Sequence, residues 1–169
     1  MEIDPRGPRF GAAITTVVLA VVMITQSGWL LAAQFLVFAI GAVAGLRYAP
    51  YGMLYRLFIR PRLGPPATTE AEGPPRFAQA VGAVIALAGL IGFAMNAGVV
   101  GTVFTALALA AAFLNVAFDV CLGCQAYLFI QRLSNQRLSN QRLFNQRLFN
   151  QRTRPSAQRA AGPDREVYQ

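Results

Sequence analysis

The only two cysteines of the chain, Cys121 and Cys124, are two residues apart and follow closely on Asp119. A Cys-X-X-Cys pair can exchange with disulfides, supply half of a metal site, or simply fill space. A structural zinc ion takes four ligands, and the chain offers two cysteines and no histidine. A metal would need a second subunit, so we expect no metal and no cofactor. Thiol chemistry, with Cys121 attacking and Cys124 resolving, and close packing remain the two interpretations.

Two long uncharged stretches must position this pair. The chain is 55% hydrophobic and 13% charged, against about 25% charged for a typical soluble domain. No charge occurs in residues 10–46 or 77–118. One membrane span needs about 20 residues, so each stretch is about long enough for two spans. Each stretch also has glycine and small polar residues near its middle, which favour a turn. The sequence therefore predicts an all-α membrane protein with four transmembrane helices, near residues 11–26, 29–46, 78–96 and 99–118.

The distribution of arginine predicts the orientation. All fifteen basic residues are arginines, and none lies in the two expected turns, at residues 26–28 and 96–98. Arginines that flank apolar segments mark the cytoplasmic side of a membrane. We expect a plasma (inner) membrane protein with both termini in the cytoplasm. The lipid bilayer is the expected partner, and no nucleic acid partner is expected despite the net charge of +8.

The chain also resembles a duplicated hairpin. Pro8-Arg9-Phe10 matches Pro75-Arg76-Phe77, and Leu57-Phe58-Ile59 matches Leu128-Phe129-Ile130. Two hairpins of two spans each would form parallel repeats, the alternative being chance matching of apolar triplets. The expected organisation is a first hairpin with an interfacial helix (1–60), a proline-rich cytoplasmic linker (61–75), a second hairpin with the cysteine pair at a helix break (76–133), and a disordered, repetitive basic tail (134–169).

The same alignment places Pro50-Tyr51-Gly52-Met53 opposite Cys121-Leu122-Gly123-Cys124. Proline disfavours helix for the residue before it, so we expect a break there and a short interfacial helix at residues 54–60. By correspondence, the fourth helix should break at residues 121–123 and resume over 125–132. Cys121 would then lie at a helix N-terminus, where free N–H groups favour a thiolate, whereas Asp119 would oppose it.

These motifs carry a resemblance to a known family. Pro75-Arg76-Phe77, Pro50-Tyr51-Gly52 with Tyr55-Arg56, and the Cys-Leu-Gly-Cys segment with Tyr127-Leu128 resemble small bacterial membrane proteins catalogued as domain of unknown function 4395. The resemblance covers about residues 3 to 133. It implies a multi-pass membrane protein with no established activity, and an association with thioredoxin-like and sulfurtransferase proteins, one of which would be a cytosolic partner.

Other polar residues of the spans are expected to be structural. Gln34, Asn96 and Asn115 should hydrogen-bond neighbouring helices. Arg47 could pair with Asp119, and Gly41, four residues before Gly45, permits close helix contact inside the bundle.

The tail from residue 131 repeats a five-residue unit that places leucine on every side of a helix. It is either a slipped duplication or a basic arm for anionic lipid or ribosomal RNA. Nothing resembles a complete enzyme site, because histidine, a glycine-rich phosphate loop and a carboxylate pair are missing from the sequence. Two functions remain: a membrane protein that handles thiols or sulfur, or a non-catalytic membrane subunit or small-solute carrier. Homo-oligomerisation stays open in both.

Overall fold

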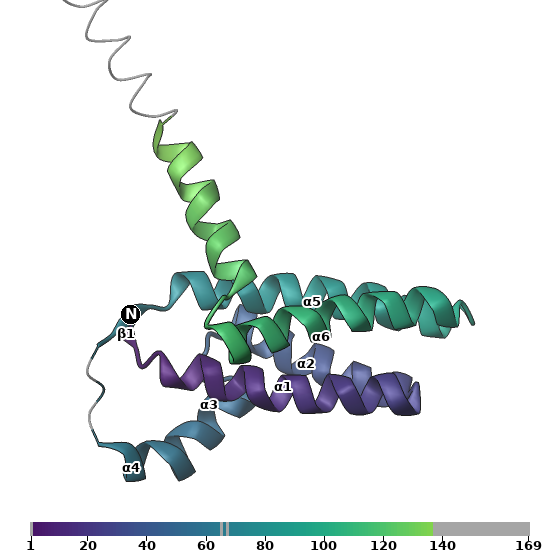
Figure 1. The fold of residues 1–169 in the computed structure, drawn as a ribbon, viewed down its shortest axis with the longest axis horizontal. Coiled ribbons are helices and arrows are strands. Elements are labelled where there is room, and N and C mark those ends of the chain that lie inside the picture. Colours follow the sequence, from purple (N-terminus) through teal and green to yellow (C-terminus); the bar gives the residue numbers. More distant parts are fainter. Residues whose placement is uncertain (1, 65, 67, 137–169) are drawn as a thin grey trace, which may run out of the picture. The chain divides into compact units, whose positions relative to one another are not determined.

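The structure, a computed structural model, describes residues 2–64, 66 and 68–136. Most of the tail predicted for 134–169 therefore lies outside the described residues. The chain divides into two units, Met1–Leu128 and Phe129–Gln169, and the first contains a bundle of helices that run side by side (Figure 1). Its four long helices are α1 (Arg6–Thr25), α2 (Gly28–Val43), α5 (Gly73–Ala94) and α6 (Gly98–Phe118).

Shorter elements lie between α2 and α5 and before α1. A continuous helical segment consists of α3 (Pro50–Leu54), the π-helix η1 (Tyr55–Ile59) and α4 (Arg60–Leu63). Strands β1 (Glu2–Ile3) and β2 (Glu70–Ala71) pair antiparallel, with Glu2 opposite Ala71. A further helix follows α6 over residues 122–136. The segment expected to be a linker, 61–75, thus contains the end of α4, β2 and the first turn of α5.

Both predicted turns are confirmed. Gln26 ends α1 and Asn96 follows α5 in the left-handed conformation, with φ of 52° and 57°. Asparagine tolerates this conformation better than most residues, and the conformation commonly ends helices. Ser27 caps α2, because its side chain accepts a hydrogen bond from the N–H of Leu30.

The helices α1 and α5 begin about five residues before the predicted starts. Pro8 lies in the first turn of α1, and Pro74 and Pro75 lie in the first turn of α5. The first four N–H groups of a helix have no partner within it, so proline removes no hydrogen bond at these positions. Two of the prolines that suggested a linker, Pro74 and Pro75, are therefore part of a helix start.

Among the residues that the structure describes, three helices are long and apolar enough to cross a membrane: α1, α5 and α6. The fourth, α2, is apolar but has only 16 residues. The most extensive contacts join α2 with α5, α5 with α6, and α1 with α6, whereas α1 and α2 touch each other less. The order around the bundle is consequently α1, α6, α5, α2.

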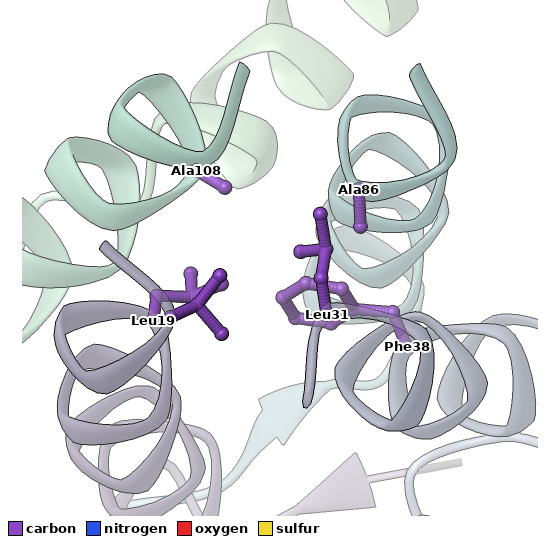
Figure 2. Close-up of a cluster of buried hydrophobic side chains, with 6 residues drawn as sticks. Leu19, Leu31, Phe38, Ala86 and Ala108 are labelled. Atoms are coloured by element: carbon purple, nitrogen blue, oxygen red, sulfur yellow. The ribbon is translucent and has the colours of Figure 1, made fainter. Parts of the chain in front are cut away.

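Buried side chains from all four helices form the core. Figure 2 shows Leu19 of α1, Leu31 and Phe38 of α2, Ala86 of α5 and Ala108 of α6 around one centre. Large apolar side chains also cover the outside: Trp29 is 89% exposed and Val84 68%. A bundle that is apolar both inside and outside fits a lipid environment better than water.

Both expected helix breaks are present, but their positions differ from the prediction. Helix α2 ends at Val43, and α3 begins at Pro50 itself rather than at residue 54, because proline is well suited to the first turn. Helix α6 ends at Phe118, and Asp119 adopts the left-handed conformation with φ of 59°. The next helix begins at residue 122. The break therefore covers residues 119–121, two residues before the predicted 121–123, and still includes Cys121.

Candidate functional site

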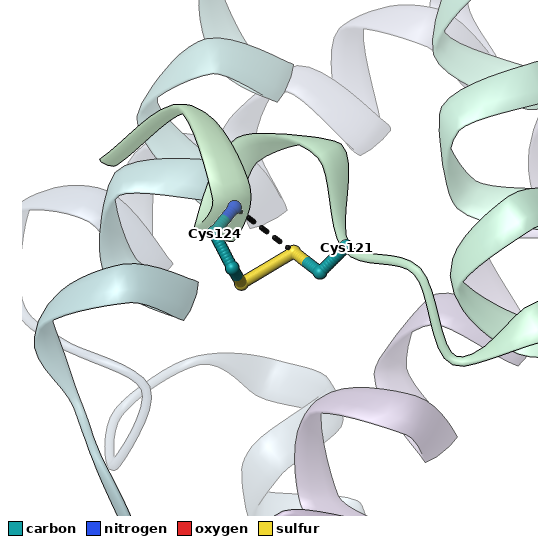
Figure 3. The surroundings of a disulfide bond; sticks show 2 residues. All are labelled: Cys121 and Cys124. Carbon is teal, nitrogen blue, oxygen red and sulfur yellow. Dashed lines mark hydrogen bonds between the residues drawn. A yellow bond between two sulfur atoms is a disulfide. The ribbon is translucent and has the colours of Figure 1, made fainter. Parts of the chain in front are cut away.

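Cys121 directly precedes the helix of residues 122–136, and Cys124 lies on its first turn. They are half-buried and joined by a disulfide, with their Cα atoms 5.2 Å apart (Figure 3). The backbone N–H of Cys124 donates to Sγ of Cys121 at 3.3 Å. The carbonyl of Cys121 accepts from the N–H of Gln125 at 3.0 Å. Cys121 is thus the residue that caps this helix, and its sulfur occupies the place that an oxygen takes in an ordinary N-cap.

Asp119, two residues before Cys121 in the sequence, forms an ion pair with Arg9. Nε of Arg9 is 2.6 Å from Oδ1 of Asp119, and both side chains are more than half exposed. The expected pairing of Asp119 with Arg47 is wrong. Because α1 packs on α6, the start of α1 reaches the end of α6, and its arginine is the one that meets Asp119. The positive charge of Arg9 offsets the carboxylate that would otherwise oppose a thiolate at Cys121.

The cysteine segment is held against the first half of α5. A Cβ atom placed on Gly123 would lie 2.6 Å from Cα and Cβ of Ala78. The ring of Tyr127 packs on the ring of Phe77, with centroids 5.7 Å apart. Only glycine permits this close approach of the turn between the cysteines to α5.

A separate cavity of about 410 Å³ is the second candidate site. Its walls come from the N-terminal segment, α1, α2, the connection from α2 to α3, α3 itself, η1, α4, the segment before α5, and α5. Neither cysteine lines it. The lining of the cavity includes Asp4, Val37, Leu46, Arg47, Ala49, Tyr51, Tyr55, Arg56, Arg60, Glu72 and Gln79.

Two tyrosines form fixed walls of this cavity. The hydroxyl of Tyr55 donates to Oδ2 of Asp4 at 2.8 Å, and its ring packs on Phe10. Burial raises the pKa of Tyr55, and the hydrogen bond to Asp4 and the negative charge of Asp4 raise it further. The hydroxyl of Tyr51 donates to Oε1 of Gln34 at 2.8 Å, and burial raises the pKa of Tyr51.

Two glutamines near the cavity have different environments. Gln34 is 1% exposed, and its Nε2 donates to the hydroxyl of Thr15 at 3.4 Å. The prediction that this amide would bond a neighbouring helix is confirmed. Oε1 of Gln79, in contrast, is buried with no hydrogen-bond partner within the part of the chain that the structure describes. Gly41 packs directly on the Gln79 side chain, which confirms the predicted close contact inside the bundle for Gly41.

Sequence reasoning found the cysteines and missed the cavity. Polar amides at Gln34 and Gln79 in apolar stretches were the local signals of it. Glu72 gave no such signal, because its role depends on a contact with a residue far away in the sequence. Glu72 accepts the N–H of Leu46 at 3.0 Å instead of pointing into solvent. Among the described residues, no group of three His, Cys, Asp or Glu side chains could hold a metal ion.

Comparison with known proteins gives one match. The profile of the family described as "Domain of unknown function (DUF4395)" matches residues 3–132. No curated protein and no solved structure matches the chain.

Proposed function

This chain belongs to the DUF4395 family, and we propose that it is an integral membrane protein that exchanges thiols and disulfides through Cys121 and Cys124. One observation supports this most directly. Cys121 caps a helix and accepts the N–H of Cys124, so both sulfurs lie within one helical turn. Cys-X-X-Cys pairs at helix N-termini have lowered thiol pKa values and react as nucleophiles.

The proposed reaction is exchange with a dithiol protein. A thiolate of the partner attacks Sγ of Cys121, which forms a mixed disulfide, breaks the bond to Cys124 and releases Cys124 as a thiolate. The second thiolate of the partner then attacks the partner's sulfur in the mixed disulfide. This step closes a disulfide within the partner and releases Cys121 as a thiolate. Two electrons and two protons pass to the pair, and the partner leaves oxidised. In the reverse direction, Cys121 attacks and Cys124 resolves, as the sequence predicted.

The two cysteines differ in ways that support these roles. The free N–H groups of the first helical turn stabilise a negative charge on the capping sulfur, and Arg9 offsets the charge of Asp119 nearby. The backbone N–H of Cys124 already points at Cys121 Sγ. We therefore assign Cys121 as the attacking thiol, with a cytosolic thioredoxin-like or sulfurtransferase protein as the proposed partner.

The test is the pH dependence of alkylation in inverted membrane vesicles after reduction. Cys124→Ser leaves Cys121 alone, and Cys121→Ser leaves Cys124 alone. We expect Cys121 to have a pKa below the reference of about 8.5 and to retain a mixed disulfide with a thioredoxin-like probe. The double serine variant is the control for labelling elsewhere. If both thiols have ordinary pKa values and neither variant impairs the cell, the cysteines are packing residues of a non-catalytic subunit or carrier.

We further propose that all four long helices cross the membrane. Three contacts support it, because they gather the starts of α1 and α5 and the ends of α2 and α6 at one end of the bundle. Strand β1 pairs with β2, Arg9 pairs with Asp119, and Arg76 donates to the carbonyls of Ala42 and Val43 at 2.7 Å. Because α1 runs away from this end, α2 must return to it. Sixteen residues of helix extend about 24 Å, and residues 44–49 would complete the crossing.

The same contacts support a duplicated hairpin. Arg9 reaches the end of α6 as Arg76 reaches the end of α2. Likewise, Phe10 packs on Tyr55 and Phe77 packs on Tyr127, at centroid distances of 5.9 and 5.7 Å. These reciprocal contacts are what an approximate two-fold axis along the membrane normal would produce.

A local irregularity accounts for one difference between the two copies. Between tyrosine and the Leu-Phe-Ile triplet, the first copy has one more residue than the second, namely Arg56. The π-helix η1 begins at this tyrosine, and its hydrogen bond runs from the N–H of Arg60 to the carbonyl of Tyr55. A π-turn accommodates one extra residue in a helix, so a one-residue insertion in the first copy explains both the additional Arg56 and η1.

Reporter fusions test the proposed topology. Fusions at Pro66 and after Gln169 should report the cytoplasm, and tags at Ser27 and Ala97 should be accessible from outside. A cytoplasmic signal from the Ser27 tag would mean that α1 and α2 do not form a spanning hairpin.

A further inference from the structure

We propose that the cavity bounded by Arg47, Arg60 and Gln79 binds a polyol phosphate, that is, a phosphate ester that carries free hydroxyl groups. The cavity volume of about 410 Å³ lies within the range of small-molecule sites, about 300–1,000 Å³. It is independent of the cysteine pair, which does not line it. Loss of thiol exchange would therefore not affect binding in this cavity, and loss of binding would not affect thiol exchange.

The charged groups of the lining favour an anion. Arg47, Arg56 and Arg60 contribute three exposed guanidinium groups. Within the described residues, none of the three forms an ion pair with a carboxylate. Guanidinium groups bind phosphate with paired, charge-assisted hydrogen bonds.

The two carboxylates of the lining keep their negative charge, so three arginines against two carboxylates leave a formal charge of +1. Both carboxylates accept hydrogen bonds from groups other than these arginines. Asp4 accepts the hydroxyl of Tyr55 and the backbone N–H of Arg6. Glu72 accepts the backbone N–H of Leu46. The arginine side of the cavity is consequently available to a phosphate group.

The polyol part follows from Gln79. Its Oε1 is buried without a hydrogen-bond partner, although buried acceptors are nearly always satisfied. Oε1 lies against Gly41 of α2, and the side chain of Gln79 also lines the cavity. A turn of the amide toward the cavity would let Oε1 accept a hydrogen bond from a ligand hydroxyl. Val37, Leu46 and Ala49 supply apolar wall for the carbon skeleton between hydroxyl and phosphate.

Contacts within the protein hold several residues of the cavity wall in place. Tyr51 is held by Gln34, and Tyr55 is held by Asp4 and packs on Phe10. Arg56 donates to the carbonyl of Arg47 at 2.7 Å, which fixes the connection before α3. A preorganised site loses less freedom on binding.

Two sources could supply this ligand, and both are used as probes with the full-length protein. Native mass spectrometry measures phosphatidylglycerol retained from mixed micelles, with phosphatidylcholine as the competitor. Isothermal titration calorimetry measures glycerol 3-phosphate, with methyl phosphate as the probe that lacks free hydroxyl groups. Phosphatidylglycerol binding alone identifies the bilayer as the source, and binding of glycerol 3-phosphate identifies a soluble metabolite. Either result supports the site, provided that the variants below alter it.

The arginine variants test the phosphate contact. Arg47→Ala combined with Arg60→Ala should weaken binding at least tenfold. Arg62→Ala is the matched control, since Arg62 is exposed on α4 and does not line the cavity. All three positions are exposed, so folding should be retained. An equal loss in the Arg62 control would indicate nonspecific charge attraction and overturn the proposal.

Two further variants test the interior. Gln79→Leu should weaken the binding of glycerol 3-phosphate and leave the binding of methyl phosphate unchanged. Val37→Phe should block both, whereas Leu36→Phe, at an outward-facing position 58% exposed, should not. Absence of binding for both the lipid and the soluble probe, or binding unaffected by the arginine, Gln79 and Val37 variants, would overturn the proposal.

Discussion

The contact between Gly123 and α5 gives the sharpest prediction about the cysteine segment. Gly123 lies between the two cysteines, and a Cβ there would lie 2.6 Å from Cα and Cβ of Ala78, where ordinary contact begins at 3.4 Å. Gly123→Ala must therefore displace the segment by about 0.8 Å, the difference between these distances. Because a backbone atom of Ala78 takes part, no side-chain rotation can relieve the clash.

The magnitude follows from similar overpacked sites. Forcing extra atoms into a packed position typically costs about 1–3 kcal/mol, which corresponds to about 5- to 150-fold in the unfolding equilibrium. The displacement also moves the first turn that holds Cys121 and Cys124 and loosens Tyr127 from Phe77. We expect a lower free energy of unfolding and faster reduction of the disulfide by dithiothreitol.

Chemical denaturation in detergent, followed by circular dichroism, measures the first effect, and the rate of thiol release measures the second. Gly98→Ala is the matched control, since a Cβ at Gly98 meets nothing within 4 Å. Adding Ala78→Gly to Gly123→Ala should restore part of the stability, because it removes the Cβ but not the Cα. If Gly123→Ala behaves like Gly98→Ala in both assays, the segment does not pack on α5 as described.

Three further predictions concern the rest of the bundle. Gln34→Leu should lower the free energy of unfolding by about 1–2 kcal/mol, measured by denaturation, because it leaves the Tyr51 hydroxyl unpaired. The free energy of unfolding should be constant just below pH 10 and fall as the pH rises above 10. The folded-state pKa of Tyr55 exceeds 10.0, so the unfolded chain loses the proton of this hydroxyl first. Tyr55→Phe should reduce this fall in a pH series of denaturation curves. Arg76→Gln should speed hydrogen exchange in the last turn of α2, whose carbonyls Arg76 binds.

Local features of the sequence determined the elements and their limits. Uncharged stretches predicted the apolar helices, and Gln26 and Asn96 marked turns that the structure contains. Pro50 predicted the break after α2. These features act through neighbouring residues, by excluding a backbone conformation or permitting one, so they can be recognised without knowledge of the fold. The start of α5 was misjudged because proline both interrupts a helix and begins one.

Tertiary structure decided which elements meet and what lies between them. Asp119 pairs with Arg9 rather than Arg47 because α1 packs on α6. Gln79 and Tyr51 line one cavity although 27 residues and an irregular connection separate them in the sequence. In a lipid environment apolar side chains neither drive helices together nor select a partner, since lipid and protein interiors are similarly apolar. Close approach at small residues and a few polar contacts make that selection, and both depend on the three-dimensional arrangement.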